Sequence, residues 1–110
     1  ERLGLDAIRL VGDGEKPIKR VGLCTGAGVE FVSLAAAKGC DAYLTADIKY
    51  HEAQKAVEQG IAVADVTHYA SEVLIAPVLQ EKLQAAAKEN GWNIEVVCSA
   101  VDGQTFWTIE

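Results

Sequence analysis

Short apolar runs and longer amphipathic segments alternate along the chain. Apolar runs that predict strands lie at residues 5–11, 18–24, 41–46 and 61–66. Two segments with helical spacing, 28–39 and 48–60, each end in a glycine, which is typical of a helix C-terminus. Only the linker-like stretch 12–17 separates the first two strands, so we expect them to form a hairpin with a long turn.

A longer helical segment spans residues 68–90. Leu74, Val78, Leu79 and Leu83 share one side of it, and Pro77 is expected to kink it or to divide it into two pieces. Residues 93–100 predict a last strand, and residues 104–110 are expected to be extended or loose.

Strands that alternate with helices at this spacing predict βαβ units. The sequence therefore indicates an α/β fold, arranged as a three-layer sandwich with a largely parallel sheet and helices on both faces. We interpret residues 1–110 as a single α/β domain, because no repeat or low-complexity tract divides them.

Composition and charge narrow the function classes. The chain is 50% hydrophobic and 24% charged, as folded proteins are, and its net charge of −6 argues against direct nucleic-acid binding. No apolar run reaches the length of a membrane span. Three cysteines without a C-x-x-C pair fit a reduced, cytoplasmic setting. The chain opens on Glu1 and contains no Met, so we expect it to be a piece of something longer.

Three strand-to-helix turns carry the candidate chemistry, because ligands in open α/β sheets bind beyond the carboxyl ends of the strands. The first turn is "CTGAG", Cys24 to Gly28. Gly26 and Gly28 permit close backbone approach, and the following helix start presents N–H groups to an anion. A plain glycine turn is the alternative, since a third fingerprint glycine is missing.

The second turn is "TADIKYH", Thr45 to His51. Asp47 has two interpretations: an N-cap of the next helix, or a functional carboxylate that shares a cleft with His51 four residues later. A solvated helical histidine is the ordinary interpretation of His51.

The third turn is "DVTHYASEVL", Asp65 to Leu74. Thr67 is a plausible N-cap, which places His68 and Glu72 side by side on one helical face. An imidazole nitrogen and a carboxylate oxygen so placed can share a cation or two adjacent ones. The alternative is a helix-start histidine beside a solvated glutamate.

Taken together, the sequences of the three turns resemble those of the Nif-three-like proteins, which are also named GTP cyclohydrolase I type two homologs. The matching pieces are "VGLCTGAG", "DAYLTADIKYHEAQKAVEQG" and "DVTHYASEVL", which occur in order between residues 21 and 83. The likeness is weaker over the first twenty and the last fifteen residues.

The resemblance implies an α/β fold of two similar lobes, assembled into homohexamers, with two metal ions in a cleft. It implies that His68 and Glu72 are metal ligands, and that the other ligands, histidines and an aspartate of the N-terminal half, have no counterpart here. The chain therefore resembles the C-terminal portion of a family member and carries about half of the metal site. Two departures from the pattern are Thr67 and Ala46, which stand where the family has glycine.

The chemistry that follows is water activation by a pair of divalent ions, with zinc, iron or manganese left open. Asp47 and Thr45 are expected to orient a water or a neighbouring group, and His51 to act as a proton shuttle. The backbone of Gly26 and Gly28 is expected to face an anionic part of the substrate. The family label suggests GTP or another nucleotide as substrate. The rival hypothesis is a non-enzymatic, metal-bearing scaffold or adaptor for protein partners.

Overall fold

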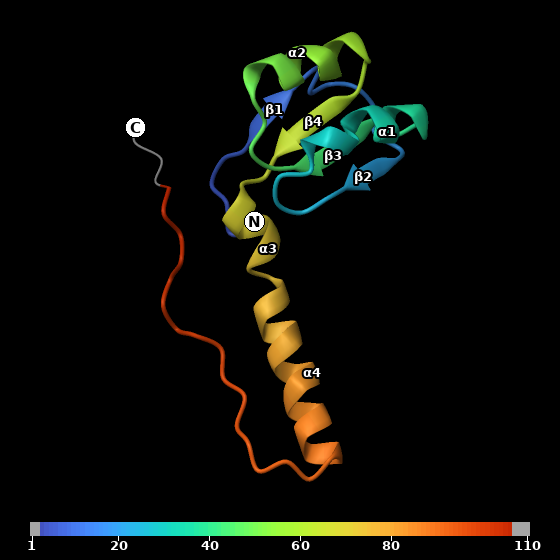
Figure 1. The fold of residues 1–110 in the computed structure, drawn as a ribbon. Helices are drawn as coiled ribbons and strands as arrows, with labels where there is room; N and C mark the ends of the chain where they lie inside the picture. The colour runs from blue at the N-terminus through green and yellow to red at the C-terminus, as the bar shows by residue number, and fades with distance from the viewer. Residues whose placement is uncertain (1–2, 107–110) are drawn as a thin grey trace. The chain divides into compact units, whose positions relative to one another are not determined.

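The computed structural model describes residues 3–106 of the chain (Figure 1). The chain divides into two compact units, Glu1–Glu72 and Val73–Glu110. The single domain proposed for residues 1–110 stays a prediction.

The first unit is an α/β unit built on four strands (Figure 1). Its elements are β1 (Arg9–Val11), β2 (Val21–Leu23), the 3-10 helix η1 (Val29–Phe31), α1 (Val32–Ala37), β3 (Ala42–Thr45), α2 (Tyr50–Glu58), β4 (Ala62–Asp65) and α3 (His68–Glu72). Gly39 and Gly60 have positive φ, 75° and 70°, just after α1 and α2. The predicted helix ends at these glycines are therefore confirmed.

The sheet has the strand order β1-β4-β3-β2, and it is largely parallel, as predicted. Strand β2 pairs with β3 and β3 with β4 in parallel, whereas β1 is antiparallel to β4. The predicted hairpin between the first two strands is wrong, since β1 and β2 occupy opposite edges. The segment between them is long enough to cross the sheet, and β1 is held beside β4 by an ion pair between Arg9 and Asp65.

One face of the sheet packs against α1 and α2. The register places Tyr43 of β3 and Val63 of β4 opposite each other on this face. They join Val32 and Ala35 of α1 and Ala56 of α2 in a buried cluster. Burial of such apolar side chains is the main stabilising contribution in a unit of this size.

The other face of the sheet is open within residues 3–72. We call it the open sheet face, and its members alternate with the buried ones along the strands: Leu10, Val21, Leu23, Ala42, Leu44, Ala62 and Ala64. The largest of them are half exposed or more, at 51% for Leu10, 53% for Val21 and 66% for Leu23. Helices were predicted on both faces, but α1 and α2 contribute to the same core cluster. The three-layer arrangement therefore stays a prediction.

The second unit contains α4 (Ile75–Glu89). The predicted division of the segment 68–90 is confirmed, but the break lies at Val73 and Leu74, before Pro77. Pro77 lies in the first turn of α4. A proline is tolerated there because the first N–H groups of a helix have no intrahelical partner.

Residues 93–100, predicted as a strand, form none in the structure. A strand needs a neighbouring backbone, and here glutamine side chains of α4 take that place. The Val96 N–H donates to Gln84 Oε1 at 2.8 Å, and Gln80 Nε2 donates to the Val96 carbonyl at 3.0 Å. Residues 104–106 have no regular structure, as predicted, and residues 107–110 lie outside the described residues.

Candidate functional site

The three predicted turns meet at the carboxyl ends of β2, β3 and β4. The Ala46 N–H donates to the Gly26 carbonyl at 3.0 Å, which joins the first turn to the second. The Val66 N–H donates to the Thr45 carbonyl at 2.9 Å, which joins the second to the third. The convergence expected from a parallel sheet is therefore confirmed.

Thr45 holds the glycine turn in place. Its hydroxyl is fully buried, donates to the Gly26 carbonyl at 3.0 Å and accepts the Gly28 N–H at 2.8 Å. The Tyr43 hydroxyl donates to the Gly28 carbonyl at 2.9 Å, and burial, with a contribution from Cys24, raises the pKa of Tyr43 to about 12. Tyr43 therefore remains a protonated donor at neutral pH.

Both glycine N–H groups of this turn already have acceptors. The Gly28 N–H uses the Thr45 hydroxyl, and the Gly26 N–H donates to Ser71 Oγ at 3.0 Å. The predicted role of Gly26, Gly28 and Thr45 in binding an anionic substrate stays a prediction. The hydrogen bonds give these residues a role in shaping the turn.

His68 lies between two carboxylates. Its Nδ1 is 2.6 Å from Asp47 Oδ2, and its Nε2 is 3.2 Å from Glu72 Oε2. All three side chains are about half exposed. The hydrogen bond that His68 donates to the Asp47 carboxylate is the main cause of a raised His68 pKa, and the negative charge of Glu72 adds to it. The imidazole is thus fixed in orientation, with one nitrogen directed at each carboxylate.

Gly26 packs directly against the His68–Glu72 pair. A Cβ at position 26 would lie 2.3 Å from Glu72 Oε1 and 3.0 Å from His68 Nε2. Gly26 also has a φ of +63°, which side-chain-bearing residues rarely adopt. The pair therefore has its present geometry only because position 26 lacks a side chain.

Ser71 links this glycine to the histidine, and the sequence interpretation missed it. Its Oγ accepts the Gly26 N–H at 3.0 Å and donates to the His68 carbonyl at 2.8 Å. Ser71 is buried, although it belongs to a short helix at the edge of the unit. Its position one residue before Glu72 in the stretch "HYASE" is the sequence feature that could have identified it.

Asp47 is not a helix cap. The N-cap of α2 is Lys49, whose N–H donates to Glu52 Oε2 at 2.8 Å in a capping box. The capping interpretation of Asp47 is therefore wrong, and its carboxylate is available to His68. Asp47 has a φ of +58°, a left-handed conformation that aspartate tolerates better than most residues.

Thr67 has a φ of +61°, although it is β-branched. It directly precedes α3, and its hydroxyl accepts the Ala70 N–H at 3.4 Å, so the predicted N-cap position is confirmed. Its own N–H donates to Asp65 Oδ1 at 3.2 Å. The chain thus keeps at Thr67 a left-handed turn that suits glycine, and this turn presents His68.

We expect Thr67→Gly to stabilise the fold by about 1 kcal/mol. Glycine removes the left-handed strain of roughly 1–2 kcal/mol, and the loss of the long capping bond and the added freedom of the unfolded chain offset part of this gain. Urea unfolding measures the change. Thr67→Ala is the control, since alanine keeps the strain and loses the hydroxyl. A Thr67→Gly variant less stable than Thr67→Ala would contradict the assignment of strain.

His51 is not part of the group. It lies in α2, is exposed and contacts the Tyr50 ring edge-on, with ring centroids 5.9 Å apart. Among residues 3–106 it makes no hydrogen bond to Asp47 or His68. The predicted pairing of Asp47 with His51 is replaced by that of Asp47 with His68, and the proton-shuttle role of His51 stays a prediction.

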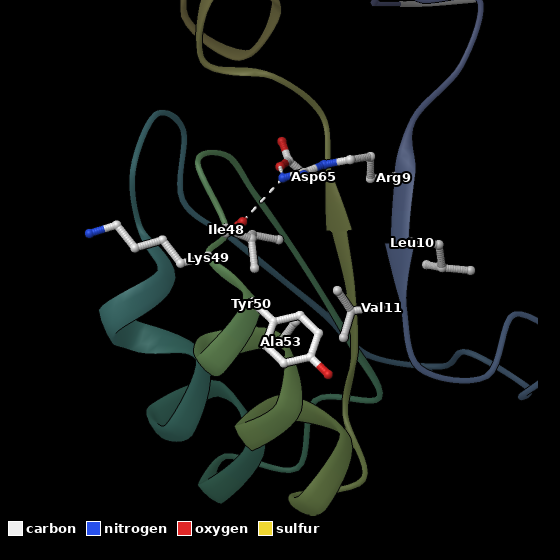
Figure 2. Close-up of a pocket in the computed structure, with 8 residues that line it drawn as sticks. All are labelled: Arg9, Leu10, Val11, Ile48, Lys49, Tyr50, Ala53 and Asp65. Atoms are coloured by element: carbon white, nitrogen blue, oxygen red, sulfur yellow. Dashed lines mark hydrogen bonds and ion pairs between the residues drawn. The ribbon is translucent and has the colours of Figure 1, made fainter.

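A small pocket of about 260 Å³ adjoins the second and third turns (Figure 2). Arg9 closes one side: its Nη2 donates to the Ile48 carbonyl at 3.1 Å and to Asp65 Oδ2 at 2.5 Å. Tyr50 and Ala53 of α2 line another side (Figure 2). The volume lies below that of typical drug-sized sites, so the pocket suits only a small group. The sequence interpretation gave no role to the ion pair that borders it.

Two absences hold for the part of the chain that the structure describes. No group of three or more His, Cys, Asp or Glu side chains among residues 3–106 is placed to hold one metal ion. Asp47 and Glu72 approach opposite nitrogens of His68, so the three cannot converge on a single point. No helix in the same residues is long and apolar enough to cross a bilayer.

A family model described as Duf34/NIF3 (NGG1p interacting factor 3) matches residues 1–104. The chain belongs to this family. A relative from Streptococcus pneumoniae, named "GTP cyclohydrolase 1 type 2 homolog", is 37% identical over 106 residues, which cover 93% of this chain and 40% of the relative. The resemblance to Nif-three-like proteins is thus confirmed.

Solved structures of NIF3 family proteins have the same fold. The Staphylococcus aureus protein SA1388 matches with a TM-score of 0.87 and 30% identity, covering 98% of this chain and 35% of that protein. A Bacillus cereus protein related to NIF3 matches with a TM-score of 0.91 and 26% identity, covering 97% and 29%. The chain therefore spans less than half the length of the relatives that it matches.

Proposed function

We propose that this chain contributes His68 and Glu72 as half of a dinuclear metal centre in a full-length NIF3 family protein. The observation that carries the proposal is the 3.2 Å separation of His68 Nε2 and Glu72 Oε2. Two donor atoms that bind one Zn²⁺ at about 2.1 Å lie roughly 3.0 to 3.4 Å apart at bond angles of about 90° to 110°. The two side chains are half exposed, so an ion could reach them.

The surroundings of the pair support a ligand role. Metal-binding histidines commonly donate their other ring nitrogen to a carboxylate, which fixes the tautomer. Asp47 accepts from His68 Nδ1 in this way, and leaves Nε2 toward Glu72. Gly26 keeps the space beside both donor atoms free of side chains. The donor set, one imidazole and one carboxylate, suits zinc, iron or manganese.

The chemistry proposed for the full-length protein is hydrolysis by an activated water. Divalent ions supply Lewis-acid activation of that water when they are bound. Within this chain, Asp47 orients and polarises His68, while Thr45 and Ser71 fix the glycine turn beside it. His51 makes no hydrogen bond to Asp47 or His68 among the described residues, so its proposed role as a proton shuttle rests on its exposed ring alone.

A nucleotide is the substrate class that we propose. The support is the name of the Streptococcus pneumoniae relative, "GTP cyclohydrolase 1 type 2 homolog". We also propose that the full-length protein assembles into a homohexamer in the cytoplasm. Light scattering on the full-length protein measures the number of copies.

The experiment that tests the ligand role is a pH profile of metal affinity in the full-length protein. A proton on His68 Nε2 competes with the metal, and the Asp47 carboxylate raises the pKa of this imidazole. We expect affinity to rise with pH through that raised pKa and to level off above it. The same shift stabilises the metal-free fold below the ordinary histidine pKa, and this contribution is lost as pH rises through the raised value.

Asp47→Asn sharpens this test. Asparagine tolerates the left-handed backbone but carries no charge, so the pH midpoint should move down and the plateau affinity should fall roughly 10-fold or more. Asp41→Asn is the matched control, because Asp41 accepts the N–H groups of Lys19 and Arg20 instead. Identical profiles for the Asp47→Asn and Asp41→Asn variants would refute the orienting role.

A second candidate function is a scaffold or adaptor for protein partners. The favouring observation is an exposed apolar series at the start of the second unit: Val73, Leu74, Ile75, Val78, Leu79 and Leu83. The family description, NGG1p interacting factor 3, names a protein interaction. Metal binding without nucleotide turnover by the full-length protein, together with a stable partner complex, would favour this function over hydrolysis.

A further inference from the structure

Arg9 connects the second and third turns from the edge strand β1 (Figure 2). Its Nη2 donates to the Ile48 carbonyl in the second turn and to the Asp65 carboxylate at the start of the third. These partners are 39 and 56 residues away in the chain. The register of the antiparallel β1–β4 pair places Arg9 directly opposite Asp65. A single nitrogen of Arg9 therefore joins the two turns that carry Asp47 and His68.

Each of these turns contains a residue in an unfavourable backbone conformation. Within the described part of the chain, Asp47 and Thr67 are the non-glycine residues with a positive φ, at 58° and 61°. Such conformations persist only where the surrounding contacts impose them. Ile48 directly follows Asp47 in the chain, and the Thr67 N–H donates to Asp65 Oδ1 at 3.2 Å. The two partners of Arg9 thus adjoin or hold the two strained positions.

The Asp65 carboxylate depends on Arg9 for its place. The Asp65 side chain is only 8% exposed, and a buried carboxylate is costly without an opposite charge. Its Oδ2 faces Arg9, and its Oδ1 accepts the Thr67 N–H. Loss of the guanidinium would leave this carboxylate buried without the cation that faces it. The backbone at Thr67, which presents His68, would then lose its support.

We propose that Arg9 is a positioning residue for the pair formed by His68 and Asp47. Through the Ile48 carbonyl it fixes the backbone beside Asp47, and through Asp65 it fixes the backbone before His68. Held in this way, the Asp47 carboxylate meets His68 Nδ1 at 2.6 Å, and Nε2 remains for a metal. The geometric role of Arg9 does not require a metal, whereas its effect on metal affinity rests on the proposed function.

The tautomer of His68 in the metal-free, full-length protein tests the geometric role. A ring nitrogen carries the proton where an acceptor meets it, so Asp47 should hold the neutral imidazole in its Nδ1–H form. NMR chemical shifts of the two ring nitrogens, recorded on protein with isotope-labelled histidine, report this form. The spectrum of the His68→Ala variant assigns the signals. We expect the Nδ1–H form in the wild type and a mixture of both forms in Arg9→Met, which keeps a long side chain but lacks the donors.

Arg20→Met is the matched control, and Arg9→Lys is the conservative variant. Arg20 also donates to a backbone carbonyl, that of Lys38, from Nη1 at 2.6 Å, and should leave the tautomer unchanged when it is replaced. Lysine offers one charged nitrogen with three donors, so Arg9→Lys should restore part of the Nδ1–H form. A wild-type spectrum for Arg9→Met would overturn the proposal. Equal mixtures in the Arg9→Met and Arg20→Met variants, or no recovery with lysine, would overturn it too.

A double variant covers the case in which Arg9→Met alone fails to fold. Arg9→Met/Asp65→Asn removes the buried charge together with its partner, and the amide oxygen of the asparagine can still accept the Thr67 N–H. The link from β1 to the Ile48 carbonyl is nevertheless lost, so we expect the mixture of tautomers to persist. A pure Nδ1–H form in this double variant would show that Arg9 does not position the pair.

Zinc titration of the same full-length variants separates this inference from the proposed metal site. We expect Arg9→Met to lower zinc affinity roughly 10-fold or more, as loss of a partner behind a metal ligand does, and Arg9→Lys to lower it less. Zinc binding that His68→Ala leaves unchanged, together with a changed tautomer in Arg9→Met, would refute the metal site alone. Zinc binding that depends on His68, together with an unchanged tautomer in Arg9→Met, would refute the role of Arg9 alone.

Discussion

Gly26→Ala should release most of the metal that the full-length protein holds at His68 and Glu72. The new methyl group would lie 2.3 Å from Glu72 Oε1 and 3.0 Å from His68 Nε2, so the Glu72 carboxylate must move away and the His68 ring must shift slightly. A 1 Å displacement is enough to spoil a metal site, because metal–ligand distances are fixed within about 0.2 Å. Metal content per protein, measured by inductively coupled plasma mass spectrometry after dialysis, checks the prediction.

Gly60→Ala is the matched control for this variant. Gly60 also has a positive φ, +70°, but a Cβ there would meet nothing within 4 Å. Both variants pay the left-handed penalty of about 1–2 kcal/mol, so both should lose a similar amount of stability from the backbone. Only the Gly26→Ala variant should also lose metal. Normal metal content in a folded Gly26→Ala variant would show that the ion binds elsewhere.

The second large effect is expected from the two donors themselves. In the full-length protein, His68→Ala and Glu72→Ala should each lower metal affinity by more than the roughly 10–100-fold that is typical for loss of an outer-shell partner. Glu72→Gln should do the same with little change in shape, since a neutral amide is a poorer ligand than a carboxylate. Calorimetric titration with zinc and with manganese measures the affinities.

His51→Ala is the control for the histidine variant. Both histidines are exposed, but His51 lies in α2, where its ring contacts that of Tyr50 edge-on. Its removal should leave metal affinity unchanged. Full metal occupancy in the His68→Ala and Glu72→Ala variants would refute the ligand assignment. An equal loss of metal affinity in the His51→Ala variant would show that the effect is not specific to His68.

The central geometry was predictable from the sequence for a physical reason. The carboxyl ends of parallel strands meet at one edge of a sheet, so residues just after β2, β3 and β4 must lie close together. Helical periodicity alone places His68 beside Glu72. These two rules are local or topological, and neither depends on the rest of the protein.

The pairing of Asp47 with His68 was not predictable by the same rules. An aspartate ahead of a helix ordinarily caps it, but Lys49 and Glu52 form the capping box of α2. The left-handed backbone at Asp47 then directs its carboxylate to the third turn. Such a choice depends on tertiary contacts that are 21 residues apart in the chain.

The predictions of a strand at residues 93–100 and of a hairpin were wrong for a related reason. Residues 93–100 have the composition of a strand, yet Gln80 and Gln84 satisfy part of their backbone, because strand structure depends on a neighbour. The hairpin prediction assumed that successive strands pair. In the structure β1 instead joins β4, where Arg9 meets the buried carboxylate of Asp65.

Calorimetric titration of zinc into the 110-residue chain and into the full-length protein tests the central claim most directly. Two protein donors rarely hold a divalent ion firmly, so the account predicts weak binding by the chain and tight binding of two ions by the full-length protein. Equally tight binding by both would contradict the claim that His68 and Glu72 are only half of the site.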